Sequence, residues 1–280
     1  MSTTTIRRAT AATRAATSPA PLTQRETIED LLAQSARGIV PIRKNFVQQG
    51  RGKDTRPGPL ASFVTAHDTR ALDAYLFVHA LASAEPWNCD YPAGTWVRAL
   101  GLGNSATPAS ARGAVSKVMK RLEDRNLVKR GRSGRRASVT LLREDGSGEP
   151  YEHPHRAGDD RWLQLPYAYW LEGHYLALSL PAKAMLLVAL SLPDGFYLPS
   201  ERADDWYAIS PDSADRGLRE LRKAALLDTD RQWVKNQRSD TGWTEHWTYT
   251  LTGSFSSSAR RAASAAGTKR KPRHDSSEAT

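Results

Sequence analysis

The chain has 280 residues, 39% of them hydrophobic and 25% charged, with a net charge of +10. This length has room for two modest domains, and the positive charge favours nucleic acid or another anionic partner. The single cysteine, Cys89, excludes an intramolecular disulfide framework and a cysteine-rich zinc site. Because no apolar run approaches the ~18 residues of a bilayer span, and no apolar signal core is present, we expect no membrane partner and a cytoplasmic, nucleoid-associated location.

The first compact domain is expected over residues 36–145. Residues 1–35 are expected to be disordered or partly helical, with a short amphipathic helix from Thr23 to Arg37. Asp68 is a suitable N-cap for a helix from Thr69 to about Ala84. A short strand over Trp87–Tyr91 and a brief helix opened by Pro92 are predicted to follow.

The clearest helix prediction covers residues 108–125. Thr107 is placed to cap this helix, and Pro108 occupies its first position, where proline is favoured. A helical period places the apolar residues on one side, namely Ala111, Val115, Val118, Met119 and Leu122. The opposite side then carries Ser110, Gly113, Lys117, Lys120 and Arg121.

A cationic hairpin is predicted directly after this helix, with its basic wing over residues 129–142. From Thr107 to Arg143 the chain has eleven basic residues against two acidic ones, Glu123 and Asp124. A helix fits the major groove of DNA, and a basic hairpin reaches phosphate or the minor groove. A solvated helix surface alone would not explain an exposed cationic loop directly after a cationic helix face.

The same plan is predicted a second time over residues 179–255, after a linker or connector over residues 146–178. Ser210-Pro211 repeats the Thr107-Pro108 start of a helix. The two strands of a longer hairpin, Trp233-Val234 and Trp243–Leu251, are predicted to follow. Residues 256–280 are expected to form a disordered basic tail.

The charge does not repeat in the second copy. From Ser210 to Thr250, seven basic residues are balanced by seven acidic ones. Because phosphate neutralisation dominates affinity for DNA, the first copy should supply most of the binding. The second copy should bind weakly, pair subunits in a homodimer or hold another partner; alternatively, Arg216, Arg219 and Lys223 form a secondary DNA-binding face.

The order of elements resembles that of winged helix-turn-helix domains. Ala114 to Leu142, AVSKVMKRLEDRNLVKRGRSGRRASVTLL, is similar to the recognition helix and wing of bacterial MarR-like and GntR-like regulators, with Asn126-Leu127-Val128 at the helix-to-strand position. Two such domains in one chain also resemble plasmid replication initiators, in which one domain reads origin repeats and the other contributes dimer contacts. The expected fold class is mainly α with small β-wings (α+β), as two tandem winged helix-turn-helix domains with disordered termini.

The resemblance implies a set of DNA-binding residues. It places Ser110, Arg112, Ser116 and Lys117 near base edges, with Arg112 the best candidate for bidentate contact to guanine. It assigns phosphate contacts to Lys120, Arg121, Arg132, Arg135 and Arg136, with one wing arginine reaching the minor groove as an alternative.

Enzyme chemistry has little support in the sequence, so no catalytic residue, metal ligand or cofactor is predicted. His153-Pro154-His155 is the one close histidine pair, and proline is unfavourable in the central strand that nucleases of that type use. Asp204 and Asp205 are adjacent, so on a helix they diverge and do not form a catalytic pair. Six tryptophans are expected at core or sheet positions: Trp87, Trp96, Trp206, Trp233, Trp243 and Trp247.

These observations favour a sequence-specific double-stranded DNA-binding protein without enzymatic activity, most simply a transcription regulator. A plasmid or phage replication initiator or partition-type protein is the alternative. A metal-dependent nuclease and a protein-interaction scaffold remain as more distant alternatives.

Overall fold

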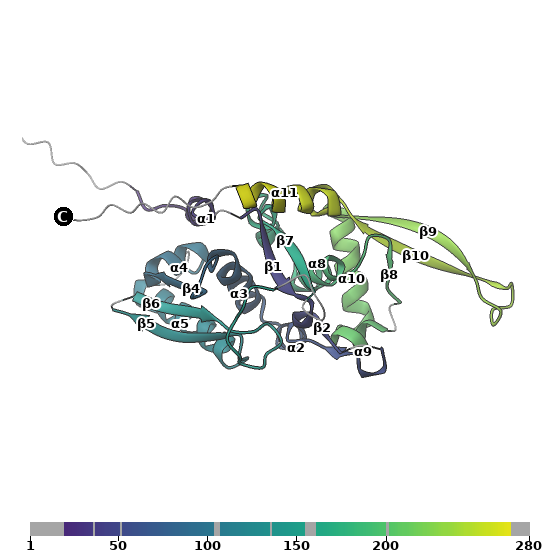
Figure 1. Cartoon of the computed structure of the whole chain (residues 1–280), viewed down its shortest axis with the longest axis horizontal. Helices are drawn as coiled ribbons and strands as arrows, with labels where there is room; N and C mark the ends of the chain where they lie inside the picture. The colour runs from purple at the N-terminus through teal and green to yellow at the C-terminus, as the bar shows by residue number, and fades with distance from the viewer. Residues whose placement is uncertain are drawn as a thin grey trace, which may run out of the picture.

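The computed structural model describes residues 20–35, 37–50, 52–103, 107–134, 136–154, 161–199 and 202–269. As expected, the fold is mixed α+β, with small antiparallel sheets (Figure 1). The helices are α1 (Gln24–Ala33), α2 (Leu60–Thr65), α3 (Thr69–Leu81), α4 (Ala93–Ala99), α5 (Pro108–Glu123), α6 (Ala168–Leu171), α7 (His174–Ala177), α8 (Leu180–Ser191), α9 (Ala203–Tyr207), α10 (Pro211–Lys223) and α11 (Ser257–Lys269). The strands are β1 (Ile39–Arg43), β2 (Gln48–Gln49), β3 (Arg56–Pro57), β4 (Asn88–Tyr91), β5 (Val128–Ser133), β6 (Arg136–Leu141), β7 (Trp162–Pro166), β8 (Phe196–Tyr197), β9 (Leu227–Lys235) and β10 (Trp243–Leu251).

Two parts of the chain share one order of elements. The first unit contains α3, β4, α4, α5, β5 and β6, and the second contains α8, β8, α9, α10, β9 and β10. Their sheets have the matching strand orders β4-β6-β5 and β8-β10-β9. The two hairpins, β5–β6 and β9–β10, lie at opposite ends of the long axis of the molecule (Figure 1).

The starts of the main helices follow the local sequence as predicted. Thr107 accepts a hydrogen bond from the Ser110 N–H at the start of α5, and Ser210 accepts one from the Ser213 N–H at the start of α10. Proline follows the cap in both helices, where its missing N–H costs no hydrogen bond. The predicted Asp68 cap of α3 is likewise confirmed by its bond from the Ala71 N–H.

Both long helices also end in the same way. Asn126 after α5 and Ala225 after α10 have positive φ angles of 56° and 55°. The next N–H then donates back into the helix, from Leu127 to Leu122 O at 3.1 Å and from Leu226 to Leu221 O at 3.0 Å. A left-handed residue at this position satisfies helix carbonyls and turns the chain into the following strand.

The segment over 146–178, predicted as a linker or connector, contributes a strand that pairs with β1, near the start of the chain. Strand β7 pairs with β1 in an antiparallel register from Ile39–Pro166 to Arg43–Trp162, and every residue of β1 is buried. Helix α8 contacts β7 and α3 contacts β1, so this two-stranded ribbon lies between the units. The buried apolar side chains form one continuous cluster through both units, because the ribbon fills the space between them.

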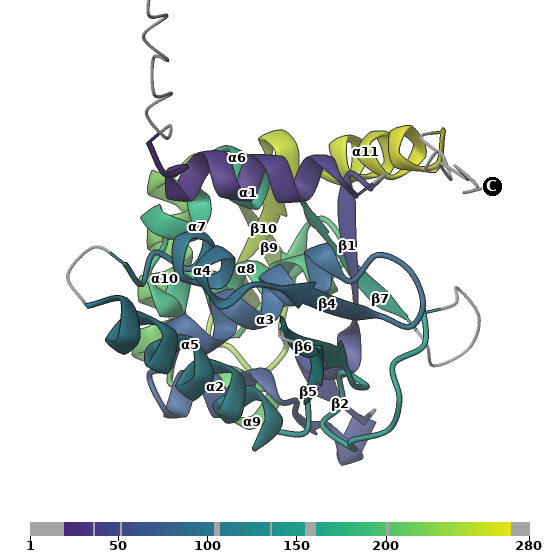
Figure 2. The same ribbon diagram turned by 90° about the vertical axis from the view of Figure 1, so that its left-hand side faces the viewer.

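Residues 257–269 form a helix, where the sequence predicted a disordered tail over 256–280. Ser257–Lys269 form α11, which packs on β1 and β7 and lies along the same edge of the molecule as α1 (Figures 1 and 2). The approach is close at Gly38, where a Cβ atom would lie 2.7 Å from Ala263 O. Residues 1–19 and 270–280 lie outside the described ranges. Within the described residues, no helix has the length and apolar character needed to cross a bilayer.

Two ion pairs, one fully and one largely buried, connect parts of the chain that are distant in sequence. Arg43 of β1 pairs with Glu144, which follows the first hairpin, at 2.7 Å with both side chains at 3% exposure or less. Lys183 of α8 donates to both oxygens of Asp73 on α3 at 2.7 Å. Burial raises the pKa of Asp73, while the Lys183 charge opposes that shift. The Asp73–Lys183 pair therefore joins the main helices of the two units directly.

Lys183→Met is expected to lower the free energy of unfolding by roughly 3 kcal/mol, because Asp73 is left as an unpaired, largely buried charge. Urea denaturation followed by circular dichroism measures this loss. Lys120→Met is the matched control, since its pair with Asp124 is 63% and 55% exposed and should be worth under about 1 kcal/mol. Adding Asp73→Asn to Lys183→Met should recover part of the loss. Equal losses for Lys183→Met and Lys120→Met would contradict a special role for the buried pair.

Candidate nucleic-acid interface

Helix α5 presents a polar face because its larger apolar residues are turned inward. The five predicted apolar positions are its buried residues: Ala111, Val115, Val118, Met119 and Leu122. Ser110, Arg112, Gly113 and Lys117 are exposed on the other side. A Cβ atom at Gly113 would meet nothing within 4 Å, so the surface of α5 is open there. Among the described residues, Arg112 and Lys117 make no ion pair.

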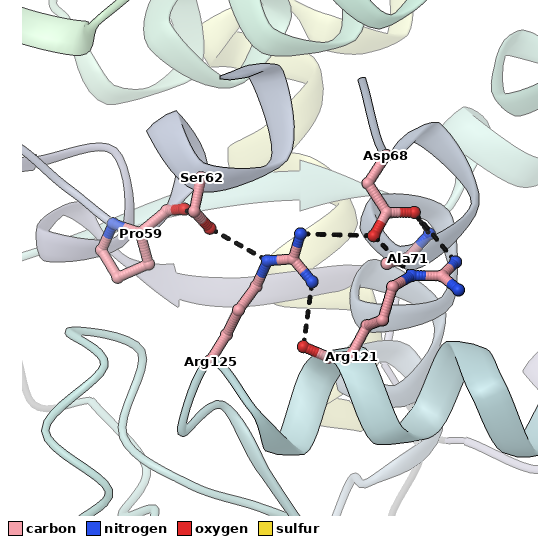
Figure 3. Close-up of polar contacts among 6 residues, drawn as sticks. All are labelled: Pro59, Ser62, Asp68, Ala71, Arg121 and Arg125. Atoms are coloured by element: carbon pink, nitrogen blue, oxygen red, sulfur yellow. Dashed lines mark hydrogen bonds and ion pairs between the residues drawn. The ribbon is translucent and has the colours of Figure 1, made fainter. Parts of the chain in front are cut away.

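The predicted phosphate contacts on the C-terminal half of α5 differ in their surroundings. Lys120 pairs with Asp124 at 2.8 Å, but both side chains are more than half exposed. Such a surface pair is weak and exchanges readily with water or another anion. Arg121 instead makes two bonds to Asp68, from Nε at 2.7 Å and from Nη2 at 3.0 Å (Figure 3). Arg121, predicted as a phosphate contact, is therefore engaged in this structure by the carboxylate at the start of α3.

Asp68 is the centre of this link, and it was predicted only as a helix cap. Besides capping α3, it lies 3.3 Å from Arg125 Nη2, and Arg125 also donates to Ser62 Oγ and Arg121 O (Figure 3). The Arg125 guanidinium lies 4.6 Å from the centre of the Phe63 ring. One carboxylate thus fixes the end of α5 to the start of α3.

The electrostatics of Asp68 follow from these contacts. Partial burial favours the protonated carboxyl, but the hydrogen bonds from Arg121 and the Ala71 N–H, and the charges of Arg121 and Arg125, outweigh it and lower the pKa. In the second unit, Glu220 takes the place of Arg121 and accepts from Ser179, the cap of α8, at 2.7 Å from the backbone N–H. In both units the N-cap residue of the first long helix therefore contacts the second long helix, although the side chains that make the contact differ.

The first hairpin adjoins the polar face of α5. Arg130 Nη2 donates to Ser116 Oγ at 3.2 Å, and the Arg130 N–H donates to the Glu123 carboxylate at 3.0 Å. Ser116, predicted to contact bases, thus lies at the junction of helix and hairpin. Arg132 and Arg136 are exposed near the end of the hairpin, while Arg135 lies outside the described residues. The Arg130–Ser116 bond therefore joins the hairpin to the polar face of α5, and both elements carry exposed basic side chains.

The corresponding face of the second unit carries an ion pair, at Arg219, and the further exposed cations Arg216 and Lys223. Arg219 pairs with Asp215 at 2.8 Å, and Arg216 Nη2 lies 3.5 Å from Ser213 Oγ. Lys223 is exposed in the last turn of α10. Over the whole stretch from Ser210 to Thr250, basic and acidic residues are equal in number.

Three of the tryptophans assigned to core or sheet positions are in a sheet but outside the core. Trp233, Trp243 and Trp247 are exposed by 59%, 45% and 47%, whereas Trp96 is buried as expected. Strands β9 and β10 pair over nine residues each, longer than the six of β5 and β6, and their outer part extends beyond the helices. The sequence predicted that these tryptophans lie in a sheet or the core, but not that three of them are exposed.

The other groups considered for chemistry are buried, lie against aromatic rings or make surface contacts. Burial raises the pKa of the Cys89 thiol to about 12 and lowers the pKa of His79 to about 3, so both are neutral near pH 7. His153 lies against the Trp87 ring, and His155 falls outside the described residues. Asp205 pairs at 3.8 Å with Arg202 on the surface. Within the described ranges, His, Cys, Asp and Glu form no group of three or more that could hold a metal ion.

Comparison of the chain with models of protein families, with curated proteins and with solved structures gives no match.

Asp68→Ala is expected to lower the free energy of unfolding by about 1–3 kcal/mol, because it removes the cap of α3 and the anion that pairs with Arg121 and Arg125. Denaturant titration measures this difference. The matched control is Asp124→Ala, whose exposed i,i+4 pair should contribute less than about 0.5 kcal/mol.

The contribution of Asp68 to the free energy of unfolding should decrease as the solution becomes acidic. Because the folded-state pKa of Asp68 lies below its ordinary value of 3.8, the stabilisation is complete above that value and is lost as the pH falls through the folded-state pKa. The stability difference between wild type and Asp68→Asn should therefore shrink below about pH 4. A difference that grows on acidification would contradict this assignment.

Proposed function

We propose that the chain is a sequence-specific double-stranded DNA-binding protein made of two winged helix-turn-helix units, of which the first supplies most of the binding. The observation that carries this proposal is the junction between α5 and the first hairpin. Arg130 bonds to Ser116, and the exposed cations Arg112, Lys117, Arg132 and Arg136 lie on the helix and hairpin that this contact joins.

This surface suits duplex DNA for geometric and electrostatic reasons. A helix fits the major groove, where base edges present distinct donors and acceptors. Ser110, Arg112 and Lys117 lie in the N-terminal part or middle of α5 and would face base edges. Lys120, Arg132 and Arg136 would contact phosphates, since Lys120 needs only to exchange its exposed partner Asp124. The Arg121–Asp68 link would hold α5 in place before DNA arrives.

The second unit would have a subordinate role on duplex DNA. Its charges cancel, and phosphate neutralisation supplies most non-specific affinity. Arg216, Arg219 and Lys223 would give a secondary contact, while the unit would also serve to pair two copies of the chain. The simplest biological role is transcription regulation. Sequencing of genomic fragments bound by the protein tests this role: fragments gathered at promoters support it, and fragments gathered at origin repeats favour a replication initiator.

Arg112→Ala is expected to relax the preference at one base pair and to weaken binding to the preferred site by about 1–3 kcal/mol, because it removes a bidentate contact to guanine. Binding titrations against a site selected from random duplexes, and against its single-base variants, measure both effects. Arg112→Lys should keep the charge but lose the preference. Equal losses on every variant site would assign Arg112 to phosphate instead.

Arg132→Ala is expected to weaken binding to all duplexes alike and to reduce the slope of log affinity against log salt by about 0.9, the value for one phosphate contact. Titrations at several salt concentrations measure the slope. Arg25→Ala removes the same charge from α1, where the side chain is 77% exposed and paired with Glu29. If Arg25→Ala changes the slope as much as Arg132→Ala does, net charge and not the proposed surface carries the binding.

A further inference from the structure

The outer part of the β9–β10 hairpin is an exposed aromatic surface that the proposed duplex interface does not use. The hairpin projects from the body of the molecule at the end opposite to β5–β6 (Figure 1). Trp233, Trp243 and Trp247 are between 45% and 59% exposed. Exposed rings in such number mark a binding surface on a protein in water.

The strand register places the three rings on one face. Trp243 is opposite Lys235, Trp233 is opposite Glu245, and Trp247 is opposite Arg231. Directly opposed residues share a face, as do residues two apart on one strand, so all six side chains lie on the same side. Trp233 is the diagonal neighbour of both other tryptophans, at about 7–8 Å between positions. The rings therefore form a zigzag row along the hairpin.

Cations are interleaved with these rings, and most of the acidic groups of the hairpin face the other way. Lys235 Nζ lies 5.8 Å from the centre of the Trp243 ring. Arg231 neutralises Glu245 at 3.2 Å, the one carboxylate on this face. Asp228 and Asp230 are opposite Thr250 and Thr248, which places them on the other face. The aromatic face therefore carries a small positive excess.

A groove of about 430 Å³ continues the row of rings toward the body. It lies between α10 and the strands β8 and β10, and its lining combines apolar side chains such as Pro211, Trp247 and Tyr249 with the carboxylates of Asp212, Asp215 and Glu245. Two of these carboxylates are paired with arginines, Asp215 with Arg219 and Glu245 with Arg231. Binding pockets for small planar groups are concave, mostly apolar and of this size. The groove has room for a base that is not stacked in a duplex.

The first hairpin is built differently at the equivalent place. There Arg132 is opposite Ala137, at the place where the second hairpin has Arg231 opposite Trp247. A small residue beside an arginine leaves the cation free for phosphate, whereas a tryptophan offers a flat face on which a base stacks. The two hairpins are thus suited to different forms of nucleic acid.

We propose that the aromatic face of β9–β10 binds single-stranded DNA, with successive unpaired bases stacked on Trp243, Trp233 and Trp247. Lys235 and Arg231 lie beside the path of the strand, where their charges attract phosphates. Stacking on indole rings tolerates any base, so binding is expected without strong sequence preference. The choice of DNA over RNA rests on the proposed function, whereas the stacking surface itself does not.

The test uses the full chain and a fluorescently labelled oligothymidine of about 12 nucleotides, a length within the range that such surfaces cover. Trp233→Ala and Trp247→Ala should each weaken binding by about 5- to 150-fold, as expected for loss of one stacked base. Trp247→Phe should keep part of the affinity because it keeps an aromatic face. Since these rings are exposed, the variants should retain the thermal unfolding temperature of the wild type.

Val234→Ala is the matched control. Val234 is 41% exposed on the same strand, but it is opposite Thr244 and therefore on the other face. The proposal expects unchanged affinity for this variant. It is overturned if Val234→Ala and the tryptophan variants behave alike, if oligothymidine does not bind at low salt, or if an oligouridine of the same length binds more tightly.

Two further measurements separate this proposal from its alternatives. Analytical ultracentrifugation reports self-association. If the wild-type chain forms a dimer that the tryptophan variants dissociate while their affinity for oligothymidine is unchanged, the face binds a second molecule of this chain and the proposal is overturned. Duplex binding is measured in parallel and should be weakened by Arg132→Ala but not by Trp233→Ala. Wild-type chain that binds oligothymidine but no duplex would refute the proposed function and leave the stacking surface standing.

Discussion

The contact between Asp73 and Lys183 determines how the two units are held together. Each residue belongs to the main helix of its unit, α3 or α8, and the two are 110 residues apart in the chain. Lys183 also donates to Tyr175 O, and Tyr169 donates to Asp73, so the ammonium group and the carboxylate have further partners in the short helices that follow β7. A buried pair with such partners tolerates little displacement, because any movement leaves a charge without its counterion.

The ribbon of β1 and β7 completes this connection. It packs against α3 on one side and α8 on the other, and the Arg43–Glu144 pair ties it to the segment after the first hairpin. Because the apolar cluster is continuous through the ribbon, the two units share a core instead of being joined by a flexible tether. Their surfaces are therefore displayed in a fixed geometry, basic at one end and aromatic at the other.

Features set by neighbouring residues could be predicted from the sequence, whereas features set by distant ones could not. The starts of α5 and α10 follow from Thr107-Pro108 and Ser210-Pro211, and the buried face of α5 follows from its period. The Arg121–Asp68 link joins positions 53 residues apart, and no local pattern signals it. The basic residues of α5 were found, but which of them is already engaged by a carboxylate depends on how α3 packs. Helix α11 was missed because its many small residues give no clear apolar face, and its packing on β1, on β7 and at Gly38 depends on residues far away in the chain.

The shared core has a consequence for how two ligand segments would be engaged at once. When two binding modules are joined by a flexible linker, the length of the linker sets the effective concentration at which the second module meets its ligand. Here the ribbon leaves no such freedom, so a strand held at one end of the molecule has a set spacing and direction relative to a helix held at the other. Coupling between the two ends would then arise from local concentration alone, and its strength would depend on whether the nucleic acid can bend to span them.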